Sequence, residues 1–207
     1  MGDVAGPTVS GGNILSMLAA MGAFRRSGEQ ILSTHGITDA AANGWYMLDE
    51  YVAALNEIET RIGPSTLFRV GQEIPNHIKL PPGLDTFEKV IGSFGPAFSM
   101  NHRGAGAGGI TFEITSTNTG IIISGTPYPC DFDRGVIQGF FRKLVKGTLD
   151  YSHDASRVPG GKHRADAGSR AHVENLAIMV HELRIDLRSE ELAGAKRFRI
   201  EHTRCDN

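Results

Sequence analysis

The spacing of hydrophobic residues predicts helices through the first hundred positions. The clearest apolar stripe runs from Leu48 to Ile62, where apolar residues recur every three or four positions and acidic residues lie mostly between them. Gly63-Pro64 ends this segment, because proline cannot continue a helix. Shorter helices are predicted over 11–23, 27–36 and 65–74.

Two of the predicted helices carry local signals at their ends. Ser27 and Gln30 have the spacing of a capping box, which would open the second helix. A further helix begins near Asp85, and we expect Pro96 to kink or break it, since proline removes a backbone hydrogen bond.

The hydrophobic period changes after the glycine-rich segment 104–109, which we interpret as a flexible turn. Apolar and polar residues alternate over 110–114, and a second apolar run follows the turn signal at 118–120, so an antiparallel hairpin is predicted. Asp131 or Asp133 then caps a helix that ends at Gly147. Strands are predicted over 149–153 and 196–202, and 173–187 has helical or mixed periodicity. The pattern as a whole predicts an α+β fold, with N-terminal helices packed with a small antiparallel sheet in one domain.

The composition fits one globular domain. The chain has 207 residues, of which 40% are hydrophobic and 21% are charged, so a sizeable core can form. We expect a disordered N-terminus at 1–10, a ligand-binding-like domain at 11–155, a basic glycine-rich loop at 156–170, and an extension at 171–207 that completes or flanks the domain. The four basic side chains of the loop are interpreted as solvated; contact with a phosphate-bearing partner or an acidic membrane is the alternative.

Charge and cysteine content limit the partners and the cellular setting that we expect for the protein. The net charge of -2 and the sequence pI near 6.4 argue against a nucleic-acid partner. Two cysteines are too few for a disulfide scaffold, so we expect a reduced, cytoplasmic setting. A transmembrane segment is not expected, because no stretch approaches the ~20 apolar residues that span a bilayer.

Two sequence blocks resemble one superfamily of ligand-binding domains. Gly11-Gly12-Asn13-Ile14 opens the first helix, and the block from Gly125 to Gly139 contains the pattern Cys-x-Phe-x-x-Gly at the start of the helix after the hairpin. These blocks and the order of elements over 11–155 resemble haem-NO-binding sensor domains, 4-vinyl-reductase-type domains and Bet-type subunits of the TRAPP complex. The resemblance implies helices packed on an antiparallel sheet around a buried pocket, with ligand binding as the usual activity.

The resemblance also implies a role for His102 that the residues only partly support. His102 lies roughly where haem-binding relatives carry an axial histidine, and one neutral imidazole can hold haem iron. The Tyr-x-Ser-x-Arg signature that holds the haem propionates is absent, and 114–118 occupies the comparable place. We favour a hydrogen-bonded structural histidine. No metal site is expected, because 156–161 lacks the cysteine that closes metal-binding relatives.

Cys130 and the nearby carboxylates admit chemical and structural interpretations. Cys130 as a metal ligand, reactive thiol or acylation site is weighed against a packing role, which we favour. Asp131 and Asp133 with His102 and His153 would supply an acid–base or metal site, but helix capping explains both carboxylates.

The functional hypothesis that follows is a non-enzymatic sensory domain for an apolar small molecule or a lipid. It would signal through a separate protein partner or as a homodimer. An enzyme is not expected, because no nucleophile–base–acid spacing occurs. The alternatives are a haem-based gas sensor that uses His102, and a scaffold with a filled core; the cofactor is left open. The ligand pocket is predicted to be lined by Phe87, Phe94, Phe98, Phe112, Cys130, Phe140 and Phe141.

Overall fold

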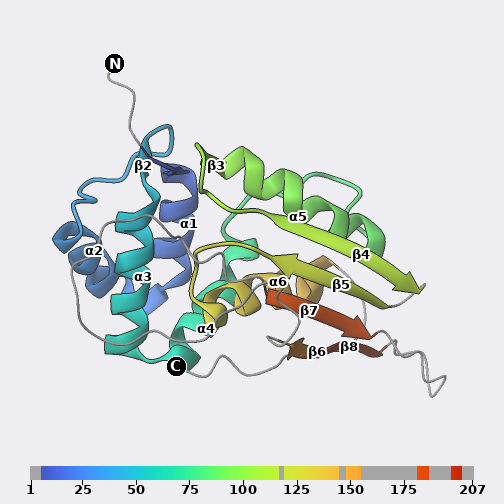
Figure 1. The fold of residues 1–207 in the computed structure, drawn as a ribbon. Helices are drawn as coiled ribbons and strands as arrows, with labels where there is room; N and C mark the ends of the chain where they lie inside the picture. Colours follow the sequence, from blue (N-terminus) through green and yellow to red (C-terminus); the bar gives the residue numbers. More distant parts are fainter. Residues whose placement is uncertain (1–5, 117–118, 145–147, 155–180, 187–196, 202–207) are drawn as a thin grey trace.

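A computed structural model describes residues 6–116, 119–144, 148–154, 181–186 and 197–201 (Figure 1). The α-helices of this part are α1 (Gly11–Ala20), α2 (Arg25–Thr34), α3 (Leu48–Ile62), α4 (Pro64–Glu73), α5 (Phe87–Asn101) and α6 (Cys130–Leu144). Two short 3-10 turns, η1 (Gly22–Phe24) and η2 (Ile74–Asn76), precede α2 and follow α4. The strands are β1 (Thr8–Ser10), β2 (Trp45–Met47), β3 (His102–Arg103), β4 (Ile110–Ser116), β5 (Thr119–Ser124), β6 (Thr148–Asp154), β7 (His181–Asp186) and β8 (Arg197–Glu201).

The strands form two sheets, which confirms the predicted α+β class. A three-stranded antiparallel sheet has the order β2-β1-β3 and lies at one end of α1 and α3 (Figure 1). The larger sheet has the order β4-β5-β7-β6-β8, and all its pairs are antiparallel except β6 with β8. Helix α5 runs alongside β4 (Figure 1).

Two hydrophobic clusters pack the helices and the sheets together. The first gathers apolar side chains of α1 to α4 with Val9 of β1, Phe98 of α5 and two residues near the start of α6, Tyr128 and Phe132. The second joins α5 and α6 to Ile122 of β5. The predicted helix over Leu48–Ile62 is observed with those bounds, and its stripe faces the first cluster.

Helices α4 and α6 cross with their backbones in close approach. A β-carbon at Gly135 would lie 2.1 Å from the carbonyl oxygen of Phe68, and one at Gly139 would lie 2.3 Å from that of Gln72. The glycines of the 125–139 block therefore have a packing function, because any larger residue would push the two helices apart.

Several local predictions were wrong at element ends. The N-terminal segment predicted as disordered includes β1, which is buried, and Ser10 caps α1 by accepting a hydrogen bond from the Asn13 backbone. Helix α2 begins at Arg25, so Ser27 lies inside it and forms no capping box. Neither Asp131 nor Asp133 is the N-cap of α6, because the helix already begins at Cys130.

Helix α5 does not break at Pro96. It runs from Phe87 to Asn101 with Pro96 inside, on its exposed side. Phe94 and Phe98 flank the proline and are both buried. We infer that their packing outweighs the single hydrogen bond that proline removes.

The segment 173–187 was predicted as helical or mixed, and its described part is a strand. Strand β7 (His181–Asp186) pairs with both β5 and β6, so sheet pairing overrides the local pattern. Residues 173–180, the loop at 156–170, the turn residue Asn118 and Gly147 lie outside the described residues.

Candidate functional site

His102 lies where α5 joins the small sheet. It follows directly after α5, and its backbone pairs with Val9 as part of the small sheet. Asn101 fixes this junction, since its amide donates to the Ala97 carbonyl and its oxygen accepts from Ser10 at 2.7 Å. His102 is only 7% exposed, so its ring chemistry is set by protein groups.

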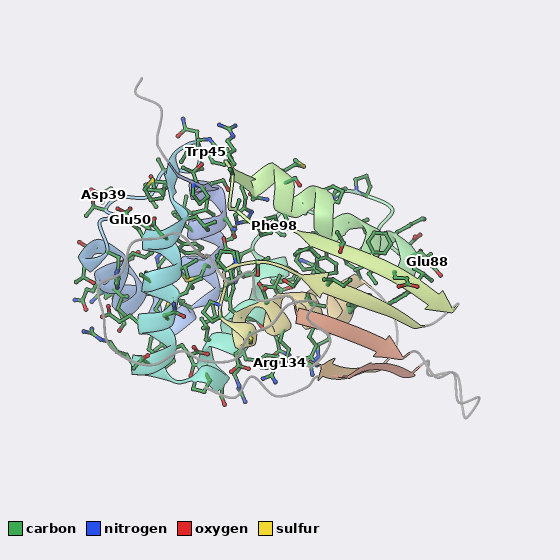
Figure 2. All side chains as sticks on the ribbon, in the orientation of Figure 1. Asp39, Trp45, Glu50, Glu88, Phe98 and Arg134 are labelled. Carbon is green, nitrogen blue, oxygen red and sulfur yellow. The ribbon has the colours of Figure 1, made fainter. Side chains whose placement is uncertain are left out.

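Both ring nitrogens of His102 have hydrogen-bond partners. Nδ1 lies 2.8 Å from the carbonyl oxygen of Phe98, which can only accept, so Nδ1 carries the hydrogen. In the neutral ring Nε2 then accepts, and the Tyr128 hydroxyl, 2.5 Å away, is its donor. One face of the ring stacks on Phe98 with centroids 3.8 Å apart. Figure 2 shows Phe98 in the interior of the molecule.

Burial keeps this pair uncharged at neutral pH. Desolvation lowers the pKa of His102, although the hydrogen bond to Phe98 raises it slightly. Desolvation raises the pKa of Tyr128 well above its usual value, and the nearby Tyr51 and Asp133 raise it further. The histidine is therefore neutral and the phenol protonated, as their hydrogen bond requires.

Tyr51 brings an unsatisfied hydroxyl to the same place. Its side chain is fully buried, and its ring meets that of Tyr128 edge to face with centroids 5.8 Å apart. Its hydroxyl has no hydrogen-bond partner among the described residues. A buried hydroxyl without a partner is destabilising by about 1–3 kcal/mol, so this position favours a group that accepts a hydrogen bond.

Asp133 is a half-buried carboxylate close enough to Tyr128 to act on its pKa. Its Oδ2 accepts hydrogen bonds from Ser124 Oγ at 2.9 Å and from Thr126 Oγ1. Desolvation raises its pKa to about 6, and the two hydroxyl donors oppose that rise. Asp133 thus ties the start of α6 to the end of β5, where we had predicted a helix cap.

The predicted Phe pocket is divided by the structure. Phe87, Phe94, Phe140 and Phe141 pack on one another, with ring centroids 5.3 to 6.1 Å apart. Phe98 belongs to the other hydrophobic cluster, and Phe112 is 41% exposed. The structure therefore brings four of these rings together in contact with each other.

The structure also places Cys130 and the nearby carboxylates, for which the sequence left alternative roles. Cys130 is the first residue of α6 and is half-buried. Its interpretations as a metal ligand, a reactive thiol, an acylation site or a packing residue stay predictions. Asp131 pairs with Arg134 at 2.5 Å, away from Asp133. Within the described ranges, no three metal-ligating side chains gather, and no helix is long and apolar enough to cross a bilayer.

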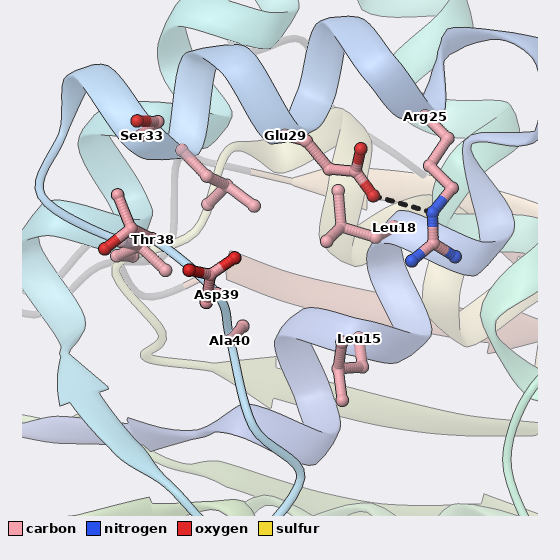
Figure 3. A pocket seen from close by; sticks show the side chains of 10 residues that line it. Leu15, Leu18, Arg25, Glu29, Ser33, Thr38, Asp39 and Ala40 are labelled. Carbon is pink, nitrogen blue, oxygen red and sulfur yellow. Dashed lines mark hydrogen bonds and ion pairs between the residues drawn. The ribbon is translucent and has the colours of Figure 1, made fainter.

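A second candidate site lies between the first two helices. A pocket of about 450 Å³, here called the α1–α2 pocket, opens between α1, α2 and the segment after α2 (Figure 3). Its lining residues are Leu15, Leu18, Arg25, Glu29, Leu32, Ser33, Ile37, Thr38, Asp39 and Ala40. It shares none of the residues predicted from the sequence.

Comparison with known proteins gives one informative result. The chain is similar in fold to an H-NOX protein. A solved structure of a double variant of Tt H-NOX superposes with a TM-score of 0.51 at 13% sequence identity, covering 84% of this chain and 92% of that one. No protein-family model and no curated protein matches the sequence. At this identity the likeness shows the fold alone, which is like that of a haem-NO-binding domain.

The residues around His102 do not fit haem in this structure. The tautomer is suitable, because an Nδ1 hydrogen donated to a carbonyl leaves Nε2 as the metal-binding atom. However, the Tyr128 hydroxyl already donates a hydrogen bond to Nε2. Tyr128 is itself only 4% exposed and is packed among aromatic rings. An iron ligand at Nε2 would require Tyr128 to leave a buried position.

Sequence reasoning found His102 and missed its partners. Tyr128 stands between Pro127 and Pro129, which gave a signal only for a tight connection. Tyr51 belongs to the apolar stripe of α3, where any buried residue fits the pattern. The local sequence at these positions does not indicate a polar role, because the Tyr51 ring contacts Tyr128, and Tyr128 bonds to His102, across long sequence separations.

Proposed function

We propose that this chain is a non-enzymatic sensory domain that binds a small, largely apolar ligand, signals through a separate protein partner, and works without haem. The similarity to an H-NOX structure over most of both chains supports a sensory, ligand-binding role. The observation that carries the haem-independent part is the hydrogen bond from Tyr128 to Nε2 of His102, which occupies the atom that would bind iron.

A haem-based gas sensor is the second candidate, and the fold favours it. It requires the Tyr128 side chain to move, with loss of its hydrogen bond and of its edge-to-face contacts with Tyr51 and Phe132. A scaffold with a filled core is the third candidate. Its support is that aromatic rings of α5 and α6 pack on one another and on Ile122 of the larger sheet, namely Phe87, Phe94, Phe140 and Phe141.

Absorption spectroscopy with native mass spectrometry separates these functions. The full chain and its His102→Ala variant are purified from a host supplied with a haem precursor. We expect no Soret band in either protein, and an additional small-molecule mass in the native chain. A stoichiometric Soret band that His102→Ala abolishes would establish the haem sensor instead. An apo mass, with no stabilisation by a panel of fatty acids and apolar metabolites, would favour the scaffold.

A further inference from the structure

The α1–α2 pocket combines an apolar floor with a polar rim. Leu18, Leu32 and Ile37 each expose 4% or less, so the floor is a part of the main hydrophobic cluster. Leu15 widens this floor from α1 (Figure 3). A volume of about 450 Å³ lies within the range of small-molecule sites.

The charges on the rim are unbalanced. Arg25 and Glu29 neutralise each other, with Nε 2.8 Å from Oε1 (Figure 3). Asp39 takes part in no ion pair or hydrogen bond within the described part of the chain, so the rim carries one uncompensated negative charge.

The backbone holds the Asp39 carboxylate over the pocket. Asp39 has φ +49°, a left-handed conformation that no other described residue except glycine adopts. Aspartate and asparagine accept this conformation better than most residues do. Figure 3 shows the resulting orientation, with the carboxylate directed between α2 and the floor formed by Leu15 and Leu18.

We propose that the α1–α2 pocket binds a small amphipathic cation, an alkyl or aryl amine whose protonated head pairs with Asp39 while its apolar body covers Leu15, Leu18 and Ile37. A carboxylate ligand is disfavoured, because Glu29 and Asp39 bring two negative charges to the pocket against the one positive charge of Arg25. An uncharged apolar ligand would leave the Asp39 carboxylate without an ionic partner. This inference rests on the proposed ligand-binding function and adds a site and a ligand class to it.

Helix α1 gives such a ligand a physical route to the buried histidine. Leu15 and Leu18 lie on α1, and the Ser10 cap of this helix donates its hydroxyl hydrogen to Asn101, next to His102. A ligand that shifts α1 would therefore act on the segment that positions His102. The pocket is nevertheless a separate site, and amine binding can be measured without reference to haem.

Titration of the isotope-labelled full chain by NMR tests the proposal. Hexylammonium is the probe, with 1-hexanol and hexanoate as uncharged and anionic analogues of equal chain length. We expect saturable shifts at the methyl groups of Leu15, Leu18 and Ile37 at probe concentrations up to about 20 mM, corresponding to millimolar dissociation constants. Hexanol should bind about two- to fivefold more weakly, the usual effect of one exposed charge pair, and hexanoate more weakly still.

Matched variants define the role of each part. Asp39→Asn keeps a residue that tolerates the left-handed backbone and should weaken hexylammonium binding about two- to fivefold. Leu15→Trp should abolish binding by filling the pocket. Glu88→Gln removes an exposed carboxylate at the opposite end of the molecule (Figure 2) and should change nothing.

Three results would overturn the amine site. These are shifts that do not saturate, equal affinity for hexanol and hexylammonium, or unchanged affinity in Asp39→Asn. Each leaves the wider proposal testable, because native mass spectrometry can still detect an apolar ligand elsewhere in the chain. Conversely, a haem-loaded protein that binds hexylammonium as described would refute the haem-independent function and keep the amine site.

Discussion

The Tyr128 hydroxyl lies 2.5 Å from Nε2 of His102, and this hydrogen bond joins segments that are 26 residues apart in the sequence. His102 follows α5 and belongs to the small sheet, whereas Tyr128 lies between β5 of the larger sheet and α6. The contact therefore links the small sheet to the segment before α6 through a pair of buried polar groups. His102 and Tyr128 are only 7% and 4% exposed, so the loss of one partner would leave the other polar group buried.

Tyr128→Phe should destabilise the protein by about 1–3 kcal/mol, because it leaves Nε2 buried without a donor. It should also raise the pKa of His102, since the phenol hydrogen favours the neutral ring. Urea unfolding measures the first effect and histidine NMR titration the second. Tyr46→Phe is the control: its hydroxyl accepts from the exposed backbone of Ala41, and we expect a smaller loss. Equal losses would argue against the buried pair.

Tyr51→Phe should leave the free energy of unfolding unchanged or raise it slightly. The Tyr51 hydroxyl is buried without a partner among the described residues, so the substitution removes an unsatisfied polar group and keeps the ring packing. The same urea experiment compares it directly with Tyr128→Phe. A loss above about 1 kcal/mol would mean that the Tyr51 hydroxyl has a partner in solution, such as a bound ligand or an ordered water.

Local pattern predicted the parts of the fold in which one helix or hairpin follows its own period. The helix over Leu48–Ile62 is an example, because its stripe alone decides which side is buried. Prediction failed where distant segments decide the outcome: β7 is a strand because β5 and β6 pair with it, and α5 passes Pro96 because Phe94 and Phe98 are packed. His102 was found through the resemblance, whereas the α1–α2 pocket depends on how two helices and a loop lie together.

Asp133→Asn should flatten the pH dependence of stability between about pH 4 and pH 6. The pKa of Asp133 is raised from 3.8 to about 6 in the folded protein, so its protonated form favours folding. This contribution is complete below the unfolded value and is lost as the pH rises through about 6. Relative to the variant, the wild type should lose up to about 3 kcal/mol over this range, and less if solvent reaches the half-buried side chain.

The comparison between wild type and Asp133→Asn also isolates Asp133 from His102. The lowered pKa of His102 has the opposite sign, because its neutral form favours folding and that stability is lost as the pH falls below the unfolded value of 6.5. Both proteins retain His102, so its contribution cancels in the difference between their unfolding free energies. A difference that does not change between pH 4 and pH 6 would show that the Asp133 carboxylate titrates normally.

Gly139→Ala should destabilise the protein by more than about 3 kcal/mol, whereas Gly92→Ala should stabilise it by about 0.5–1 kcal/mol. Both glycines lie inside helices, so each substitution brings the same gain in helix propensity. They differ in space: a β-carbon at Gly139 would lie 2.3 Å from the Gln72 carbonyl oxygen, whereas one at Gly92 would only touch the Phe112 ring at 3.5 Å. Thermal and urea unfolding of the two variants measure the contrast. If Gly139→Ala proved as stable as the wild type, the close crossing of α4 and α6 would be refuted, and with it the packing role of the glycines in the 125–139 block.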